Sequence, residues 1–295
     1  MLHAMLRLVI PKGSLERATM QLFEDADLSV TRSSEVDYKA TIDDPRVAEV
    51  RVLRPQEIGR YVSEGLFDIG ITGRDWVEET NSDVVELTEL HYSKATARPI
   101  RMVLAVAQDS PYRSVADLPD GVRVHTEYPE ITRRFLEKNG VNGVVSLSYG
   151  ATEAKVPEIA DAVVEITETG RALRAAGLKV VDEVLVSYTL LIANPLAYAD
   201  PEKRKAMEQL MVLLLGSLDA RGRVMVKLNV DEPNLAAVID LLPALKSPTV
   251  SKLFGQDAYA VETVVAKSMI NTLIPALVDA GATGILELPI SKIVA

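Results

Sequence analysis

Segments with the pattern of β-strands alternate with segments of helical pattern along the first part of the chain. Residues 6–10 and 67–71 are short apolar runs typical of buried strands. Each run is followed by a turn of small and polar residues. A helical pattern is predicted over 15–26 after the first run, and a helix that Thr72 can cap after the second. A chain that alternates strands and helices in this way folds into an α/β protein with a largely parallel sheet.

A second series of the same kind begins near residue 100. Strands are predicted over 101–106, 121–125, 144–147 and 161–166, with a helix over 131–138, and the chain returns to a strand pattern over 185–193. We therefore expect two α/β domains. The first contains residues 1–97 plus 187–215, and the second contains residues 98–186.

The pattern changes again after residue 200. Met207, Leu210, Met211, Leu214 and Leu218 lie on one face of a long predicted helix. The segments that follow read strand, helix, strand, strand, helix, strand, over 224–230, 234–242, 250–253, 259–265, 268–280 and 284–288. This β-α-β-β-α-β order is that of a ferredoxin-like domain, which we expect over residues 216–295.

Charge and composition exclude several classes of function. Lys and Arg number 32 and Asp and Glu number 42, so the net charge is −10, whereas nucleic-acid binding normally needs a basic surplus. The sequence has no Cys, and its His residues, at 3, 91 and 125, lack the spacing of metal ligands. No segment approaches the roughly 20 apolar residues that span a bilayer, and no export signal is visible, so we expect a cytoplasmic protein.

Three strand-to-helix turns are candidate anion sites. They are Pro-Lys-Gly-Ser at 11–14, Thr-Gly-Arg-Asp at 72–75 and Thr-Glu-Thr-Gly-Arg at 167–171. Each presents free backbone N–H groups at a helix start, where an anion is stabilised. Thr72 is also expected to cap its helix, with Asp75 completing a capping box. The alternative is that each glycine serves only the backbone of the turn.

The third turn carries the most specific pattern. Asp161 and Glu165 lie on the preceding strand, and Thr167 opens the turn itself. Carboxylates can accept hydrogen bonds from sugar hydroxyls, and a Thr-Gly turn can surround a phosphate. The residues alone leave two interpretations open: a site for a ribose phosphate, or a strand with solvent-facing acids and a capped turn.

Several segments together resemble ATP phosphoribosyltransferase, the first enzyme of histidine biosynthesis. They are Leu-Arg-Pro-Gln-Glu-Ile at 53–58, Asp-Ile-Gly-Ile-Thr-Gly-Arg-Asp at 68–75 and the segment 161–173. Gly-Ala-Thr-Glu-Ala at 150–154, Lys-Ser-Pro-Thr at 246–249 and the segment 281–286 fit the same family in the same order. The resemblance implies a catalytic core of the bilobal periplasmic-binding-protein type. The C-terminal ferredoxin-like module matches the long form of the family, which carries its own histidine-sensing domain.

The family reaction joins N1 of the ATP adenine to C1 of the ribose of phosphoribosyl pyrophosphate (PRPP), giving phosphoribosyl-ATP and pyrophosphate. The adenine nitrogen is the nucleophile, so the enzyme needs no Cys or Ser nucleophile. Its task is to hold two polyanions in line and to stabilise the leaving pyrophosphate. By resemblance we expect Mg²⁺ as cofactor, held mainly by substrate phosphates without a metal site of the protein, and a homo-oligomer, dimeric or hexameric.

The resemblance also implies roles for individual residues. As catalytic residues it implies Lys12, Arg54, Asp75 and Glu165, and as the ATP side Lys12, Gly13, Arg54, Gly73 and Asp75. For PRPP it implies Glu153, Asp161, Glu165, Thr167, Glu168, Thr169, Gly170, Arg171, Ala172 and Leu173. For the inhibitor histidine it implies Asp231, Ser247, Thr249 and Gly284.

Two departures from the family pattern keep other functions open. The family usually has Asp where this chain has Glu165, and Thr where it has Ala172. A catalytically silent regulatory homologue is therefore one alternative. A bilobal solute-binding or ligand-sensing protein is the other, because it shares the same fold. Among single residues, Trp76 is expected in the core or the cleft wall, and His91 and His125 in local hydrogen bonds.

Overall fold

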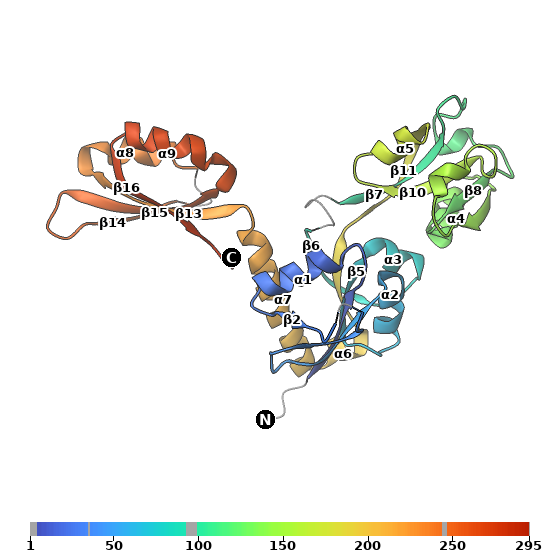
Figure 1. Cartoon of the computed structure of the whole chain (residues 1–295), viewed down its shortest axis with the longest axis horizontal. Coiled ribbons are helices and arrows are strands. Elements are labelled where there is room, and N and C mark those ends of the chain that lie inside the picture. Colours follow the sequence, from blue (N-terminus) through green and yellow to red (C-terminus); the bar gives the residue numbers. More distant parts are fainter. Residues whose placement is uncertain (1–4, 35, 93–98, 244–246, 295) are drawn as a thin grey trace. The chain divides into compact units, whose positions relative to one another are not determined.

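The protein consists of two compact units, Met1–Met211 and Val212–Ala295. Figure 1 shows the chain as a computed structural model, which describes residues 5–34, 36–92, 99–243 and 247–294. The division lies within the long helix α7 (Pro201–Ala220). Among the described residues, no helix is both long and apolar enough to cross a bilayer.

The first sheet of the first unit has seven strands in the order β2-β3-β4-β1-β5-β12-β6. They are β1 (Leu6–Pro11), β2 (Val30–Thr31), β3 (Lys39–Ile42), β4 (Val47–Leu53), β5 (Ile69–Gly73), β6 (Val85–Leu90) and β12 (Thr189–Ala193). The central strands β4, β1 and β5 run parallel, and their connections include α1 (Glu16–Asp25) and α2 (Pro55–Ser63). β1 is buried along Leu8, Val9 and Ile10, as expected for a strand covered on both faces.

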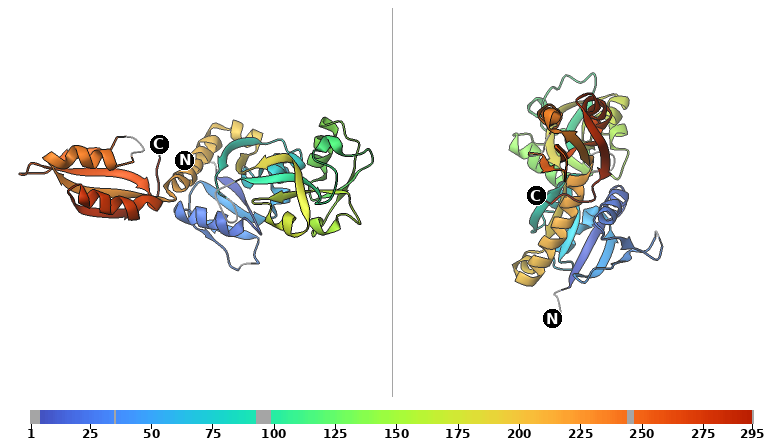
Figure 2. Two further views of the ribbon diagram at one scale, coloured as in Figure 1. Left: turned by 90° about the horizontal axis from the view of Figure 1, so that it is seen from above. Right: turned by 90° about the vertical axis from the view of Figure 1, so that its left-hand side faces the viewer.

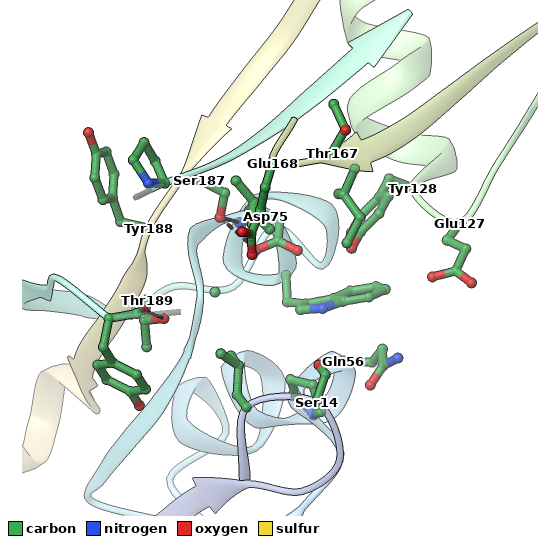
Figure 3. Close-up of a pocket in the computed structure, with 18 of the residues that line it drawn as sticks. Ser14, Gln56, Asp75, Glu127, Tyr128, Thr167, Glu168, Ser187, Tyr188 and Thr189 are labelled. Carbon is green, nitrogen blue, oxygen red and sulfur yellow. Dashed lines mark hydrogen bonds between the residues drawn. The ribbon is translucent and has the colours of Figure 1, made fainter. Parts of the chain in front are cut away.

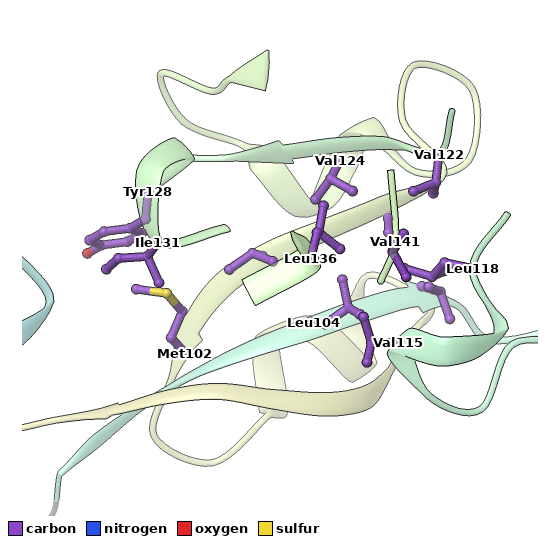
Figure 4. Packing of buried hydrophobic residues seen from close by; sticks show 13 residues of the cluster. Met102, Leu104, Val115, Leu118, Val122, Val124, Tyr128, Ile131, Leu136 and Val141 are labelled. Carbon is purple, nitrogen blue, oxygen red and sulfur yellow. The ribbon is translucent and has the colours of Figure 1, made fainter. Parts of the chain in front are cut away.

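The second sheet has five strands in the order β11-β7-β10-β8-β9. They are β7 (Ile100–Ala107), β8 (Arg123–Thr126), β9 (Val144–Leu147), β10 (Ala162–Thr167) and β11 (Leu178–Ser187). Their connections include α4 (Pro129–Lys138), the short 3-10 helix η2 (Thr152–Lys155) and α5 (Arg171–Ala175). Met102, Leu104, Tyr128 and Leu136 pack in the core of this lobe (Figure 4).

The two sheets form two lobes that the chain crosses twice. β7 leads into the second lobe and β11 leads out of it, and these two strands pair antiparallel along their length. β12 follows β11 directly and inserts between β5 and β6 of the first sheet. The first lobe is thus built from two distant parts of the chain, and α3 (Arg74–Glu79) and α6 (Pro195–Ala199) belong to it.

The second unit is a four-stranded antiparallel sheet covered by two helices. Its order is β14-β15-β13-β16, with β13 (Arg223–Asp231), β14 (Thr249–Lys252), β15 (Ala258–Ala266) and β16 (Ala282–Pro289). Both helices, α8 (Leu235–Leu241) and α9 (Ile270–Asp279), lie on one face of the sheet (Figure 1 and Figure 2). The predicted β-α-β-β-α-β order is confirmed, as is the α/β class of the first unit.

Some local predictions differ from the structure. The sequence reasoning missed β3, β6 and the first part of β11, because their half-exposed residues give a weak pattern. The predicted capping role of Thr72 is wrong. Thr72 is fully buried in β5 and its Oγ1 donates to the carbonyl of Pro55 at 2.8 Å, so it anchors the start of α2 instead. Gly73 is the residue that precedes α3.

A buried carboxylate ties the first strand to the returning part of the chain. Asp68, 2% exposed, accepts from the guanidinium of Arg7 at 3.0 and 3.2 Å and from the ammonium of Lys203 at 2.8 Å. Burial alone would raise the pKa of the Asp68 carboxyl, but the hydrogen bonds from Arg7 and Lys203 outweigh it and lower the pKa below its ordinary value. β1 and α7 are therefore joined through one ionised group.

We expect Asp68→Asn to destabilise the first unit by about 2 kcal/mol at neutral pH, because Arg7 and Lys203 lose their common counter-charge. A lowered folded-state pKa contributes stability above the unfolded-state value of about 3.9, and the contribution is lost as pH falls through the folded-state pKa. The difference between variant and wild type should therefore shrink in acid. Urea unfolding at several pH values measures it. Glu64→Gln, which removes an exposed pair with Arg60, is the control and should change little. An equal effect of both variants would contradict the prediction.

Candidate functional site

A pocket of about 330 Å³ lies between the two lobes of the first unit. The first lobe and the crossing strands meet the second lobe here, at the carboxyl ends of β5 and β10 (Figure 3). Its lining residues are Ser14, Leu15, Pro55, Gln56, Gly73, Asp75, Trp76, His91, Tyr92, Pro99, Ile100, Glu127, Tyr128, Ile166, Thr167, Glu168, Ser187, Tyr188 and Thr189.

Asp75 is the most buried charged group of this pocket, with 3% of its surface exposed. The Ser187 hydroxyl donates to its Oδ1 at 2.7 Å and accepts from its backbone N–H at 3.0 Å. The Tyr128 phenol, from the opposite lobe, faces the carboxylate (Figure 3) and lowers its pKa. Burial raises the pKa of Asp75, and Ser187 and Tyr128 act against that rise.

Aromatic side chains form much of the remaining wall. Trp76 and Tyr128 lie with ring centroids 4.5 Å apart, one from each lobe. His91 and Tyr188 make an edge-to-face contact at 5.4 Å. Flat faces of this kind suit a planar heterocycle, and the buried carboxylate beside them can accept a hydrogen bond from its edge.

The charges of the lining are all acidic. Asp75, Glu127 and Glu168 line the pocket, and its described lining residues include no Lys or Arg. Burial, and after it the charge of Asp75, raises the pKa of Tyr128, so the phenol stays neutral at physiological pH. Phosphate groups inside this lining would need a cation with them. Bare phosphates fit better at its edge.

The turn after β10 forms one edge of the pocket through Thr167 and Glu168. Gly170 has φ +69° and donates its N–H to Thr167 Oγ1 at 2.6 Å. The guanidinium of Arg174 donates to the carbonyl of Thr169 at 3.1 Å, and a Cβ at Gly170 would lie 2.8 Å from Arg174 Nη1. Gly170 is thus favoured by its left-handed backbone, whereas the Arg174 side chain could shift to admit a Cβ. Sequence reasoning missed Arg174, although it lies four residues after Gly170 on the helix.

Glu165 lies two residues before that turn and is half-buried. Burial raises the pKa of the Glu165 carboxyl, and the nearby charges of Glu127 and Glu153 raise it further. Hydrogen bonds from the N–H of Ile166 and from Thr152 act against this rise, but the pKa stays above its ordinary value. The structure therefore brings the predicted residues Glu153 and Glu165 together, with Glu127 beside them.

The predicted cations of the ATP side lie beside the pocket. Lys12 Nζ is 4.1 Å from the ring centroid of Tyr38, and a Cβ on Gly13 would lie 3.6 Å from Arg54 Nη1. Gly13 and Arg54 are the chain neighbours of the lining residues Ser14 and Pro55. Gly73 and Asp75, predicted for the same side, line the pocket itself.

Two predicted PRPP residues have other partners. Asp161 lies at the opposite end of β10 from the turn and accepts two bonds from the Arg123 guanidinium, at 2.7 and 3.1 Å. Leu173 is 2% exposed and packs in an apolar cluster with Val163 and Leu178. Their side chains stabilise the second lobe, and we leave them out of the proposed site. Thr169, Arg171 and Ala172 stay on the turn and in α5.

Sequence reasoning also missed most of the wall of the pocket. Glu127, Tyr128, Ser187 and Tyr188 were not predicted, since they become neighbours only where the crossing strands meet the first lobe. Trp76 is a cleft wall, which was one of its two expected places. His91 lines the pocket, while the Nδ1 of His125 is buried without a hydrogen-bond partner among the described atoms.

The four residues predicted for histidine are exposed on the second unit. Asp231 ends β13 and pairs with Ala258, whereas Thr249 begins β14 at the level of Glu262 and Lys227. Four residues of strand separate Lys227 from Asp231, which is about 13 Å. Ser247 and Gly284 complete the set, and Lys246 lies outside the described residues. Within one chain the side chains of Asp231 and Thr249 do not converge on a single small ligand.

The fold and the pocket define a bilobal α/β protein with a cavity between its two lobes. The family profile of ATP phosphoribosyltransferase (HisG) matches residues 54–216, and that of the HisG C-terminal domain matches residues 220–292. The chain belongs to the ATP phosphoribosyltransferase family, in its long form. The family's enzymes are pentosyltransferases that catalyse the first step of histidine biosynthesis.

Relatives support this membership over nearly the whole chain. An ATP phosphoribosyltransferase of Pelotomaculum thermopropionicum is 47% identical over 289 residues, covering 98% of this chain and 99% of its own. One of Solibacter usitatus is 47% identical over 290 residues, covering 98% and 99%. The solved ATP phosphoribosyltransferase (HisG:HisZ) complex of Thermotoga maritima contains a chain that is 27% identical, with a TM-score of 0.61, covering 72% of this chain and 99% of its own. These findings favour the enzyme over the solute-binding alternative.

We expect Ser187→Ala to move the acid limb of kcat/KM towards higher pH. Burial already raises the pKa of Asp75, and the Ser187 hydroxyl lowers it, so removing that hydroxyl raises the pKa further. The ionised carboxylate then forms only at higher pH. A pH–rate profile measures the shift, with Ser251→Ala on the exposed strand β14 as control. Unshifted profiles in the Ser187 variant would show that Asp75 need not be ionised.

Proposed function

We propose that the pocket between the lobes is where ATP and PRPP meet in this chain. The new bond forms between N1 of the adenine and C1 of the ribose, while the bond from C1 to the pyrophosphate oxygen breaks. The observation that carries the proposal is the meeting of Asp75 and its aromatic neighbours with the turn of Thr167 to Gly170 at one pocket. Holding the two substrates in line there is the main catalytic demand.

On the ATP side, the adenine faces the aromatic wall of Trp76, Tyr128 and Tyr188. Ionised Asp75 only accepts hydrogen bonds, so it pairs with the amino group of the base and leaves N1 free to attack. Lys12 and Arg54, beside the pocket, are placed for the triphosphate, which the acidic lining would repel.

On the PRPP side, the 5′-phosphate binds at the turn of 167–172. Arg171 and Arg174 supply the cations there, and the backbone N–H groups after Gly170 supply donors. Glu165 and Glu153 accept from the ribose hydroxyls. Glu165 and Ala172 then adjust these contacts relative to the family's usual Asp and Thr, without removing them.

The acidic lining of the pocket bears on which cofactor the reaction needs. Family members use a divalent cation, and we propose Mg²⁺, bound to the pyrophosphate of PRPP. Among the described residues, no group of three or more His, Asp or Glu side chains is arranged to hold a metal ion. The acidic lining therefore accepts the pyrophosphate only as its magnesium complex, in which the cation offsets Asp75 and Glu168.

Regulation and assembly belong to the same proposal. We assign residues 1–97 plus 187–215 and 98–186 to the two catalytic domains and 216–295 to a histidine-sensing domain; the 97/98 boundary lies outside the described residues. Because Asp231 and Thr249 are separated on the sheet, histidine would contact a subset of the predicted residues or a site completed by a second copy. This favours a homo-oligomer, which we expect in the cytoplasm.

Incubation of the purified chain with ATP, PRPP and Mg²⁺ tests the proposal directly. Formation of phosphoribosyl-ATP and pyrophosphate, abolished by a chelator and restored by Mg²⁺, is the expected result. Binding of both substrates without product would identify the chain as a catalytically silent homologue. Failure to bind PRPP would refute the assignment of the turn.

We expect Arg174→Ala and Arg171→Ala each to raise KM for PRPP about tenfold, since each removes a charge-assisted contact to the phosphate. KM for ATP should change much less. Steady-state kinetics with each substrate varied measures the split. Arg133→Ala, which removes an exposed cation paired with Glu130 on α4, is the matched control. An equal rise in KM for PRPP and for ATP would indicate a general loss of structure instead.

We expect Asp231→Ala to abolish inhibition by histidine while leaving uninhibited turnover nearly unchanged, because Asp231 is exposed on the second unit and lines no part of the pocket. Titrating histidine into the assay and into a calorimeter measures both effects. Unaltered inhibition of the variant, or wild type that binds no histidine, would remove the basis for this site.

A further inference from the structure

Two helices, one from each lobe, are joined by hydrogen bonds between the end of the first and the start of the second. α3 begins at the pocket with Asp75 and Trp76 and ends at Glu79, while α4 begins immediately after the pocket residue Tyr128. The Glu79 carboxylate accepts from the backbone N–H of Glu130 at 3.0 Å through Oε1 and from that of Ile131 at 3.0 Å through Oε2. Both carboxylate oxygens are thus used on the other lobe.

α4 has no cap of its own. Its preceding residue is Tyr128, whose side chain makes no capping bond, and its first residue is Pro129, which has no N–H. The next two N–H groups are those of Glu130 and Ile131, and Glu79 receives both. A side chain of the first lobe therefore caps the free N–H groups at the start of α4.

The contact is reciprocal. Arg134 of α4 donates to the backbone carbonyl of Glu78, near the end of α3, at 2.8 Å. Its bond to the Glu78 carboxylate is longer, at 3.4 Å, and both side chains are about half exposed. Trp76 lies in the first turn of α3 and Tyr128 lies just before α4, so both residues connect these hydrogen bonds to the pocket. Their rings are 4.5 Å apart.

We propose that Glu79 is a positioning residue, which holds Tyr128 of the second lobe on Asp75 and Trp76 of the first and so sets the width of the pocket between them. The inference rests on the proposed use of this pocket for both substrates. Glu79 does not line the pocket, so it acts through the helix that it caps. Without it, α4 and Tyr128 can move away from Asp75 while each lobe stays folded on its own core.

Trp76 reports this contact without any assay of activity. It is the single Trp of the sequence and lies against Tyr128 across the lobes, so its fluorescence in the ligand-free protein follows their separation. Glu79→Ala should shift Trp76 emission to the red and raise KM for ATP and for PRPP, each about tenfold, the equivalent of one lost cap, with a smaller change in kcat. Glu79→Gln keeps one acceptor oxygen and should lie between Ala and wild type.

Glu78→Ala is the matched control. It removes a neighbouring carboxylate of the same helix but leaves the carbonyl that Arg134 holds, so emission and KM should stay as in wild type. Unchanged Trp76 emission and KM in Glu79→Ala, with only a lower thermal midpoint, would overturn the proposal and leave Glu79 a stabilising residue of α4. Equal effects of Glu78→Ala and Glu79→Ala would overturn it as well. Should the wild type lack transferase activity, the proposed function fails, whereas emission and the binding of ATP alone still decide the role of Glu79.

Discussion

The burial of one carboxylate at the meeting of three segments organises the first unit. Asp75 lies in α3, directly after β5. The Ser187 hydroxyl comes from β11, the strand that returns from the second lobe, and Tyr128 belongs to the second lobe itself. A buried carboxylate is costly unless it is hydrogen-bonded, so each partner must be in place for the others to be stable. At this junction the end of β5, the returning strand and the second lobe meet in the wall of the pocket.

The acidity of the pocket bears on how the proposed site would serve two polyanionic substrates. The lining offers Asp75, Glu127 and Glu168, while the cations Lys12, Arg54, Arg171 and Arg174 lie around it. In the proposed function, bases and sugar hydroxyls would bind to acceptors and aromatic faces, and phosphates to the cations outside. A divalent ion carried by the substrate would offset the charge of the acids beside the pyrophosphate. Substrates without the ion would be repelled, which would favour the productive complex.

Much of the fold was predictable, because burial imposes a period on each element. The strands over 6–11, 69–73 and 100–107, and the elements of the second unit other than the exposed β14, follow apolar patterns that need no knowledge of their neighbours. β6 and the first part of β11 were missed because polar side chains interrupt their apolar residues without a regular period. Asp161 has the composition of a sugar ligand, yet Arg123 on the neighbouring strand occupies it, and only the pairing of β8 with β10 reveals that.

The sequence by itself determined the alternation of elements, the glycine turn after β10 and the motifs that place the chain in its family. These are local features, because a turn with φ +69° at Gly170 or an apolar run depends only on residues that are consecutive in the sequence. The tertiary structure decided which residues share the pocket. Ser187 meets Asp75 across 112 positions of sequence and Glu79 meets Glu130 across 51. Such pairs carry no periodic signal, because they form only when distant parts of the chain come together in the folded protein.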